Sequence, residues 1–377
     1  MAKRSLRADE RLAWLRLSRS EQVGPATFRR LIAAFGTAQT VIEALPELSR
    51  RSRGRPIELH SADAAEQEVD RLTTMGGRLI AKGEPDYPDP LAAIEDAPPV
   101  ISVLGRIDLL PRPLVAVVGA RNASANGRFL AETLARQLGE LGWVVVSGLA
   151  RGIDAAAHQG ALEGGTIAVL AGGIDKPYPP ETERLYGEIS ERGLLIAESP
   201  LGRVPQARDF PRRNRIVSGM SLGTVVVEAA VRSGSLITAR LAGEQGRQVM
   251  AIPGSPLDPR CRGANHLIRE GALLVESAAD VDEAIRGTPG NGRPDRLWSQ
   301  RYPEDDEDEL GEPSEIPEKS STSVVERYLS LSPVAVDELL RQCQLSAPVL
   351  RMSLLELELA GRLQWHAGNR VSLLATG

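Results

Sequence analysis

Cysteine is nearly absent from this sequence. The 377 residues contain only two, Cys261 and Cys343, far apart in the chain. A disulfide framework and a four-cysteine zinc site are therefore excluded. Histidine is almost as rare, and its four positions (His60, His158, His266 and His366) are scattered. We accordingly predict no metal site and no cofactor.

A long apolar run is missing from the start of the chain as well. The first residues, MAKRSLRADERLAWLRL, mix charged and apolar side chains throughout. This pattern fits neither a secretory signal peptide nor a membrane span, so a cytoplasmic protein without membrane contact is expected. Aromatic residues make up only 3% of the sequence, which makes those beside polar motifs informative.

The net charge of −5 comes from one acidic segment and does not describe the rest of the chain. Residues 286–323 contain five basic and ten acidic residues, so this segment alone accounts for the whole net charge. An acidic stretch with scattered proline and glycine cannot bury apolar surface. We therefore predict a disordered acidic linker over 287–322, which separates a large N-terminal part from a small C-terminal one.

The central part, residues 81–286, alternates short apolar runs with helical patterns. Its clearest run is LVAVV at 114–118, which is β-branched and followed by glycine, as is typical of a buried parallel strand. The predicted strands are 114–118, 143–146, 166–170, 194–197, 223–227 and 248–252, and the predicted helices are 126–141, 153–163, 181–191, 212–219 and 235–245. This order predicts an α/β fold with a doubly wound, mostly parallel, Rossmann-like sheet.

Two small domains are predicted on either side of this core. Residues 1–80 are typical of an all-α domain of the SAM or helix-hairpin-helix kind, in which Gly24-Pro25 opens a helix. Such a turn can offer backbone N–H groups to a phosphate, or can simply connect two packed helices. Residues 323–377 follow the order helix, turn, helix, hairpin, which predicts a winged helix. The charges of that segment balance, so DNA binding and protein binding are both open for it.

Ligands of open α/β sheets bind at the carboxyl ends of the strands, and four polar segments fall there. The first, Gly119 to Ser124, combines a tight turn, a helix start and Arg121, and is interpreted as a phosphate site rather than an ordinary turn. The second, 147–154, contains Gly148; its Asp154 is interpreted as a helix N-cap and the nearby His158 as structural. The third, 172–179, contains Lys176 and an aromatic residue.

The fourth segment, 203–215, has the most specific composition. It contains five arginines against one acidic residue, Asp209, with Phe210 in the middle. Arginines that neutralise phosphates around a ring that stacks on a base are typical of a single-strand site. The alternative is a solvated helix face with a buried phenylalanine.

A catalytic site is difficult to assemble from these residues. The sequence has no Ser/His/Asp order, no metal cluster and no Walker lysine motif. One segment, 221–228, loosely resembles the signature of lysine-decarboxylase-like nucleotide phosphoribohydrolases, although Ser221 and Leu222 occupy glycine positions. Glu228 would be the general acid/base of such a nucleoside-monophosphate phosphoribohydrolase, or a polar residue at a helix start. We predict no enzyme and keep this hydrolase as the alternative.

Taken together, the motifs resemble the DNA-processing protein A (DprA/Smf) family in its three-domain form. The resemblance covers about residues 114–281 and rests on an ordered series of motifs. These are the Gly-x-Arg turn at 119–121, SGLARGIDAAAH at 147–158, GGIDKPYPPE at 172–181, FPRRNRIVSG at 210–219, VVVEAAVRSGSLITAR at 225–240, PGS at 253–255 and GANHLIREGA at 263–272.

The resemblance implies a non-catalytic protein of natural transformation that protects incoming single-stranded DNA and helps to load the RecA recombinase on it. The DNA contacts assigned from its motifs are Gly119, Arg121, Gly148, Lys176, Phe210, Arg212, Arg213, Asn214 and Arg215. It also implies a homodimer with contacts near Asn265, Leu267, Ile268 and Leu274, residues whose pattern equally allows an internal strand or helix. One departure is Pro180, where many members have lysine, which weakens the expected role of that loop.

Overall fold

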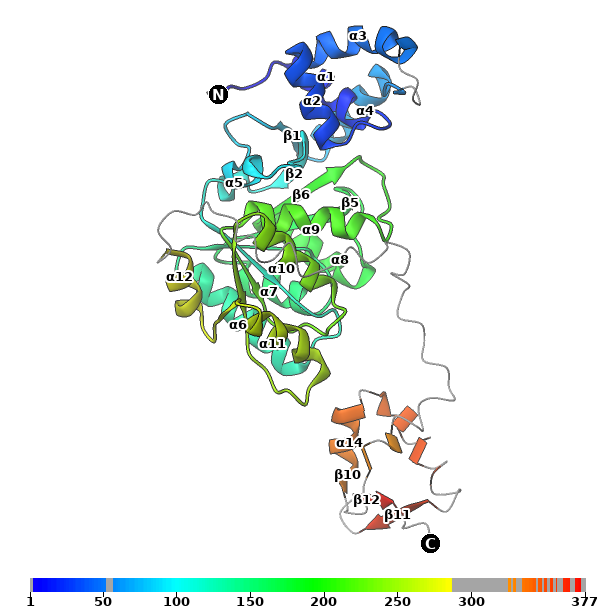
Figure 1. The fold of residues 1–377 in the computed structure, drawn as a ribbon, viewed down its shortest axis with the longest axis vertical. Helices are drawn as coiled ribbons and strands as arrows, with labels where there is room; N and C mark the ends of the chain where they lie inside the picture. The colour runs from blue at the N-terminus through cyan, green and yellow to red at the C-terminus, as the bar shows by residue number, and fades with distance from the viewer. Residues whose placement is uncertain are drawn as a thin grey trace. The chain divides into compact units, whose positions relative to one another are not determined.

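The computed structural model describes residues 3–51 and 57–286, and residues 325–373 with gaps at 327, 330–333, 344, 348, 351–352, 355–356, 358–361 and 367–369. The chain divides into two compact units, Met1–Pro303 and Glu304–Gly377 (Figure 1). The predicted linker over 287–322 lies outside the described residues.

A nine-stranded sheet forms the centre of the described part of the first unit, in the order β1-β2-β6-β5-β4-β3-β7-β8-β9. Pairing is parallel from β6 to β9, and antiparallel between β1 and β2 and between β2 and β6. The strands are β1 (Arg78–Ala81), β2 (Val100–Gly105), β3 (Leu114–Val118), β4 (Val144–Ser147), β5 (Thr166–Gly173), β6 (Leu194–Ser199), β7 (Gly223–Val226), β8 (Gln248–Ala251) and β9 (Leu273–Leu274). The predicted doubly wound, mostly parallel sheet is confirmed.

Helices cover both faces of this sheet (Figure 1). They are α5 (Asp89–Ala93), α6 (Ala125–Glu140), α7 (Ile153–Ala161), α8 (Glu183–Arg192), α9 (Asp209–Met220), α10 (Gly234–Glu244), α11 (Arg262–Arg269) and α12 (Ala278–Arg286). Strand β3 shows why its run is continuous and apolar: Val115 and Val117 pack in one core with α6 and α7, whereas Leu114, Ala116 and Val118 pack in another with α9 and α10. A strand buried on both faces needs no polar alternation.

Four helices form the N-terminal part: α1 (Ala8–Arg19), α2 (Pro25–Phe35), α3 (Ala38–Arg51) and α4 (Ala62–Thr74). The first three pack around a small apolar core of their own, whereas the buried Ala65 and Leu72 of α4 belong to a core shared with the sheet. Leu17, Phe28 and Val41 are buried in the core of the first three helices, and the ring of Trp14 lies 4.9 Å from that of Phe28. The predicted helical domain is confirmed.

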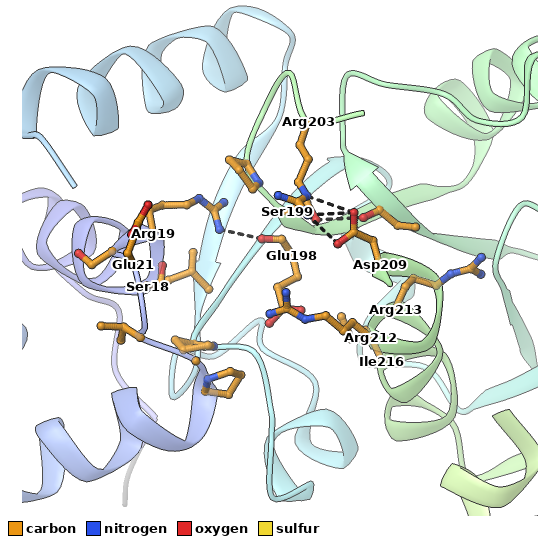
Figure 2. A pocket seen from close by; sticks show the side chains of 18 of the residues that line it. Ser18, Arg19, Glu21, Glu198, Ser199, Arg203, Asp209, Arg212, Arg213 and Ile216 are labelled. Carbon is orange, nitrogen blue, oxygen red and sulfur yellow. Dashed lines mark hydrogen bonds and ion pairs between the residues drawn. The ribbon is translucent and has the colours of Figure 1, made fainter. Parts of the chain in front are cut away.

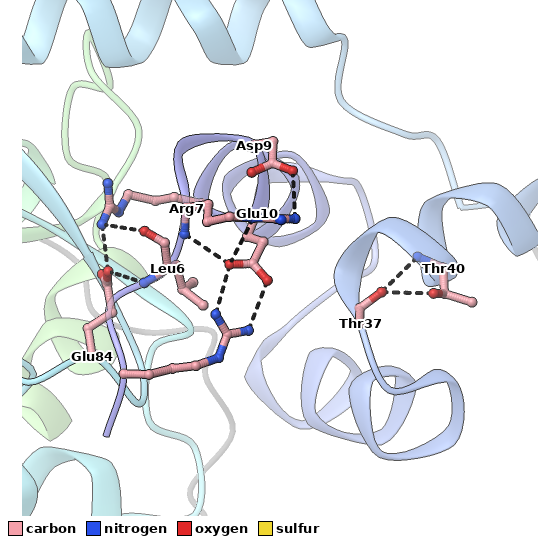
Figure 3. Close-up of polar contacts among 9 residues, drawn as sticks. Leu6, Arg7, Asp9, Glu10, Thr37, Thr40 and Glu84 are labelled. Carbon is pink, nitrogen blue, oxygen red and sulfur yellow. Dashed lines mark hydrogen bonds and ion pairs between the residues drawn. The ribbon is translucent and has the colours of Figure 1, made fainter. Parts of the chain in front are cut away.

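Buried charges connect these helices to the sheet. Arg19, at the end of α1, forms an ion pair with Glu68 of α4 at 2.8 Å and donates to the backbone carbonyl of Glu198 in β6 at 2.7 Å (Figure 2). Glu84 accepts hydrogen bonds from the backbone N–H of Leu6 and from the guanidinium of Arg11 (Figure 3). These hydrogen bonds hold the pKa of the Glu84 carboxyl below its usual value although burial opposes them.

The second unit has its own apolar core, which includes Leu339, Leu354 and Val371. Its described elements are β10 (Val334–Ala335), α14 (Val336–Cys343), β11 (Leu363–His366) and β12 (Arg370–Leu373), with the sheet order β10-β12-β11. The predicted winged helix is confirmed as a fold, while the turn of its hairpin at Gly368 lies outside the described residues.

Candidate nucleic-acid interface

The loops after the parallel strands meet at one edge of the sheet, as the sequence predicted. The start of α7 packs directly on the turn after β3, because the backbone N–H of Ile153 donates to Ala120 O. A Cβ on Gly119 would lie 2.6 Å from Ile153 and 2.9 Å from the carbonyl oxygen of Glu228. Glycine at 119 is therefore required by close packing of three loops, and its substitution would displace the turn that carries Arg121.

An aromatic and cationic cluster lies on this edge. The guanidinium carbon of Arg121 lies 5.1 Å from the centre of the Phe210 ring, and the Tyr178 ring lies 5.8 Å from it on the loop after β5. Arg121 and Tyr178 are exposed, and Phe210 is half-buried. The sequence placed Phe210 and Arg121 in the site, but the contribution of Tyr178 was not assigned; its only signal was an aromatic residue in a loop at the end of a strand.

Exposed cations lie on the loops after β3 and β5 and around the start of α9. Among the described residues, Arg121, Lys176, Arg208 and Arg212 are exposed and have no ion pair. Arg203 differs, because it forms a 2.8 Å ion pair with Asp209. Asp209 therefore neutralises one of the five arginines predicted to contribute positive charge in 203–215. The side chains of Arg208 and Arg212 face solvent without such a partner among the described residues.

Arg213 lies beneath the surface of the cluster. Its side chain is 7% exposed, and its Nη1 atom lies 4.0 Å from Asp154. A Cβ on Gly148 would lie 1.2 Å from that Nη1 atom, so only glycine leaves room for this guanidinium. Burial lowers the pKa of Arg213 to about 10. The group therefore remains a cation at neutral pH. It lines a small hollow together with Lys176, Tyr178 and Phe210.

Arg215 and Asn214 lie further from solvent than expected. The Arg215 guanidinium is 7% exposed and donates to both oxygens of Glu198 at 2.6 and 2.7 Å and to the backbone carbonyl of Asp96. Its hydrogen-bonding groups are thus occupied within the protein, which gives it a structural role, and we leave it out of the proposed DNA contacts. Asn214 is partly buried and donates weakly, at 3.4 Å, to Gly234 O at the start of α10.

Asp154 and His158 are both structural. Asp154 is not the N-cap of α7, which is Gly152; instead its buried carboxylate accepts the N–H of Gly148 at 3.1 Å. Burial raises the pKa of this carboxyl, and Arg213 opposes the effect. The Thr166 hydroxyl donates to Val145 O, so it must accept from His158 Nδ1 at 2.7 Å. Burial lowers the pKa of His158 to about 3, so the imidazole is neutral.

Glu228, the candidate general acid, is held as a structural carboxylate. It accepts hydrogen bonds from the backbone N–H of Ser124 at 2.9 Å and from its hydroxyl at 2.6 Å. The same Ser124 hydroxyl accepts a hydrogen bond from the backbone N–H of Gly127 and caps α6.

In the part of the chain that the structure describes, no group of three or more His, Cys, Asp or Glu side chains could hold a metal ion.

A second hollow of about 450 Å³ lies between the start of α2 and the core (Figure 2). The Gly24-Pro25 turn lines one side, and Arg203, Arg212 and Arg213 line the other. Gly24 is the N-cap of α2, whose first turn carries no acidic residue. The predicted phosphate-binding turn therefore faces the arginines. The alternative, that this turn only connects two packed helices, stays open.

The four residues expected at a dimer contact have different environments. Leu267 is 2% exposed and belongs to the core of the single chain, so it has little surface to offer a partner. Asn265 exchanges two hydrogen bonds with the backbone of Gly254. Ile268 is partly buried, whereas Leu274 is 51% exposed on the edge strand β9. An outer contact is thus available mainly to Leu274 and its neighbour Leu273.

Comparison with known proteins identifies the family of each part of the chain. Residues 78–286 match the model of the family described as DNA recombination-mediator protein A, residues 8–70 match a DprA-like N-terminal HHH domain, and residues 312–369 match the DprA winged helix domain. DNA processing protein DprA of Streptococcus pneumoniae is 48% identical over 197 residues, which are 52% of this chain and 70% of the relative. The Bacillus subtilis protein of that name is 42% identical over 213 residues, 56% and 72% of the two chains.

Two solved structures share the fold. The X-ray structure of DNA processing protein A from Streptococcus pneumoniae has 36% sequence identity and a TM-score of 0.57, and the match covers 69% of this chain and 86% of that one. DNA processing protein A from Helicobacter pylori, whose structure was reported for its single-stranded DNA binding mode, has 27% identity and a TM-score of 0.52, with 56% and 96% covered.

The fold and site define a Rossmann-like α/β protein flanked by a helix-hairpin-helix domain and a winged helix. The chain belongs to the DNA recombination-mediator protein A family, the DprA/Smf proteins that process DNA. The resemblance inferred from the sequence motifs is thereby confirmed.

Proposed function

We propose that this protein binds single-stranded DNA at the carboxyl edge of its sheet, without turnover of nucleotides. The observation that carries the proposal is the contact of the Phe210 ring with both Arg121 and Tyr178, together with Lys176, which lines the same hollow and has no ion pair among the described residues. A flat ring stacks on a base of any sequence, and the cations neutralise the adjacent phosphates. The Helicobacter pylori relative, which is described as binding single-stranded DNA, supports this assignment.

The proposed contacts divide into two kinds. Arg121, Lys176, Phe210 and Arg212 would touch DNA directly, because their side chains reach the surface or line the hollow there. Gly119, Gly148, Arg213 and Asn214 would support them: the glycines leave room, Arg213 holds a buried positive charge, and Asn214 connects α9 to α10. We also propose the domain bounds 1–80, 81–286, 287–322 and 323–377.

The stacking role of Phe210 is tested by Phe210→Leu, which keeps apolar bulk and removes the flat ring. We expect a loss of about 1–3 kcal/mol in affinity for oligo-dT, with an unchanged salt dependence because no charge is altered. Fluorescence anisotropy with labelled oligo-dT measures both. Phe129→Leu is the matched control, since Phe129 is 72% exposed on α6. Equal affinities of wild type and Phe210→Leu would contradict the stacking role.

In the cell, we propose that the protein acts in the cytoplasm during natural transformation, where it protects incoming single strands and helps to load RecA. Membership of the family supports this role. The structure adds one finding: among the residues it describes, no helix has the length and apolar character needed to cross a membrane. In a mixture of RecA, ATP and single-stranded DNA, the protein should accelerate filament formation and slow nuclease digestion; no change in either would refute this role.

We further propose that the protein forms a homodimer through the β9 edge. Leu273 and Leu274 are 43% and 51% exposed there, and an edge strand with exposed apolar side chains favours pairing with another chain. Leu274→Arg is therefore expected to produce monomers in sedimentation velocity. Leu141→Arg, at a similarly exposed leucine at the end of α6, should leave the dimer intact. A wild-type monomer, or a variant that still dimerises, would refute the proposal.

A further inference from the structure

Unpaired arginines continue along the carboxyl edge beyond the Phe210 cluster. Arg151, in the turn after β4, and Arg232, in the turn after β7, are both exposed, and neither forms an ion pair within the described residues. In the strand order, β3 lies between β4 and β7. Arg121, which follows β3, therefore has such an arginine on each side, in the turn after the neighbouring strand.

The contacts between these turns fix that arrangement. The Gly152 backbone packs on the turn of Arg121, since a Cβ there would lie 2.3 Å from Ala120 O and 2.5 Å from Arg121 O. On the other side, Ala120 N–H donates to Glu228 O at 2.6 Å, four residues before Arg232. Asn214 connects α9, the helix of Phe210, to Gly234 at the start of α10, two residues after Arg232.

The turns that carry these arginines contribute no negative charge of their own. The turns 119–124, 147–153 and 229–234 contain no aspartate or glutamate. Two buried carboxylates lie next to these turns in the sequence: Glu228 accepts hydrogen bonds from Ser124, and Asp154 accepts one from Gly148 and lies 4.0 Å from Arg213. Exposed acidic residues elsewhere in the unit commonly pair with arginine, for example Glu140 with Arg136 and Glu163 with Arg192. Nothing within these turns therefore offsets the charge of Arg151 and Arg232.

We infer that Arg151 and Arg232 bind phosphates of the single strand on either side of Arg121, so that the DNA backbone crosses the sheet edge instead of ending at the Phe210 cluster. This inference rests on the proposed function. Neighbouring strands are about 4.8 Å apart, so the four intervals from β6 to β7 span roughly 19 Å. That length corresponds to about six nucleotides at the 3.4 Å rise of a stacked strand, and to fewer if the strand is extended. Helix α10, capped by Ser233, adds backbone N–H groups beside Arg232.

The test uses the full chain, labelled dT12 and a salt series, with anisotropy as readout. Arg151→Gln/Arg232→Gln removes two phosphate contacts without adding repulsion. Its salt slope should be shallower by about 1.4, since each single-strand contact contributes about 0.7. Arg151→Glu/Arg232→Glu should show the same loss and bind more weakly still, by roughly tenfold or more at low salt. The control is Arg136→Gln/Arg192→Gln, which removes two exposed arginines from helix ends at the opposite edge of the sheet.

The outcomes separate this inference from the function on which it rests. If wild type binds dT12 and Arg121→Glu weakens binding, but the double Gln variant keeps the wild-type slope, then Arg151 and Arg232 do not contact phosphate. A loss seen only in the Glu variant would show long-range repulsion and would equally refute the contact. If wild type itself fails to bind dT12, both proposals fall. Circular dichroism and the melting temperature of each variant verify folding, and the surface position of both arginines makes the Gln pair well tolerated.

Discussion

Reversing the charges of Arg121 and Arg212 together should weaken the binding of single-stranded DNA on the order of a hundredfold at low salt. Both side chains are exposed and lack an ion pair among the described residues; Arg121 lies in the turn after β3, and Arg212 lies in the first turn of α9. Arg121→Glu/Arg212→Glu removes two cations and introduces two anions beside the phosphates. The salt slope should become shallower by about 1.4, because two single-strand contacts are lost.

The measurement compares labelled oligo-dT with a duplex of equal length across a salt series. Single strands should bind wild type more tightly than the duplex does, since Phe210 can stack only on an unpaired base. The matched control, Arg136→Glu/Arg192→Glu, makes the same change in net charge at helix ends on the opposite edge. If the control weakens binding as much as the test variant, net charge and not the site controls affinity, and the proposed interface is wrong.

Glu228→Ala should lower the free energy of unfolding by about 2–4 kcal/mol, because a buried carboxylate that accepts two hydrogen bonds is lost. Glu228 is 7% exposed, and both of its hydrogen bonds come from Ser124, the N-cap of α6. Its loss would also weaken the first turn of α6 and the packing of Gly127. Urea denaturation followed by circular dichroism measures the change.

Glu132→Ala is the control for this variant, since Glu132 is exposed on the same helix, and its change should stay within about 0.5 kcal/mol. The phosphoribohydrolase alternative makes an opposite prediction for Glu228. A general acid/base would leave the variant stable and abolish release of a base from nucleoside monophosphates. A stable Glu228→Ala protein, together with such an activity in wild type, would overturn the structural role.

The helix α9 illustrates where prediction from sequence stopped. Its arginines were counted as one positive cluster, but a helix packed on a sheet has a buried side and an exposed side. Arg212 faces outward, whereas Arg213 and Arg215 face inward, toward Asp154, Glu198 and the Asp96 backbone. These partners come from distant segments of the chain, so spacing along α9 cannot identify them.

The burial of Leu267 and the first two strands of the sheet also could not be predicted from local sequence patterns. The pattern of Asn265, Leu267, Ile268 and Leu274 allowed an outer contact or an internal strand or helix, and only the structure shows that the side chain of Leu267 is buried in the core of the chain. Strands β1 and β2 were not predicted, because they extend the sheet antiparallel at its edge and lack the strand–helix alternation of the parallel part.

The sequence by itself determined the alternating core, the flanking domains and the segments to which we assign the proposed site. Parallel strands buried on both faces must be short continuous apolar runs, and their carboxyl ends must meet at one edge. For this reason the run at 114–118 coincides with β3, and the segments of Arg121, Lys176 and Phe210 were found without a structure. Only the tertiary structure decided which cations stay free. An arginine is free to meet a phosphate or is engaged within the core according to the acids that distant segments bring beside it, and that neutralisation depends on contacts in space, not on neighbours in the chain.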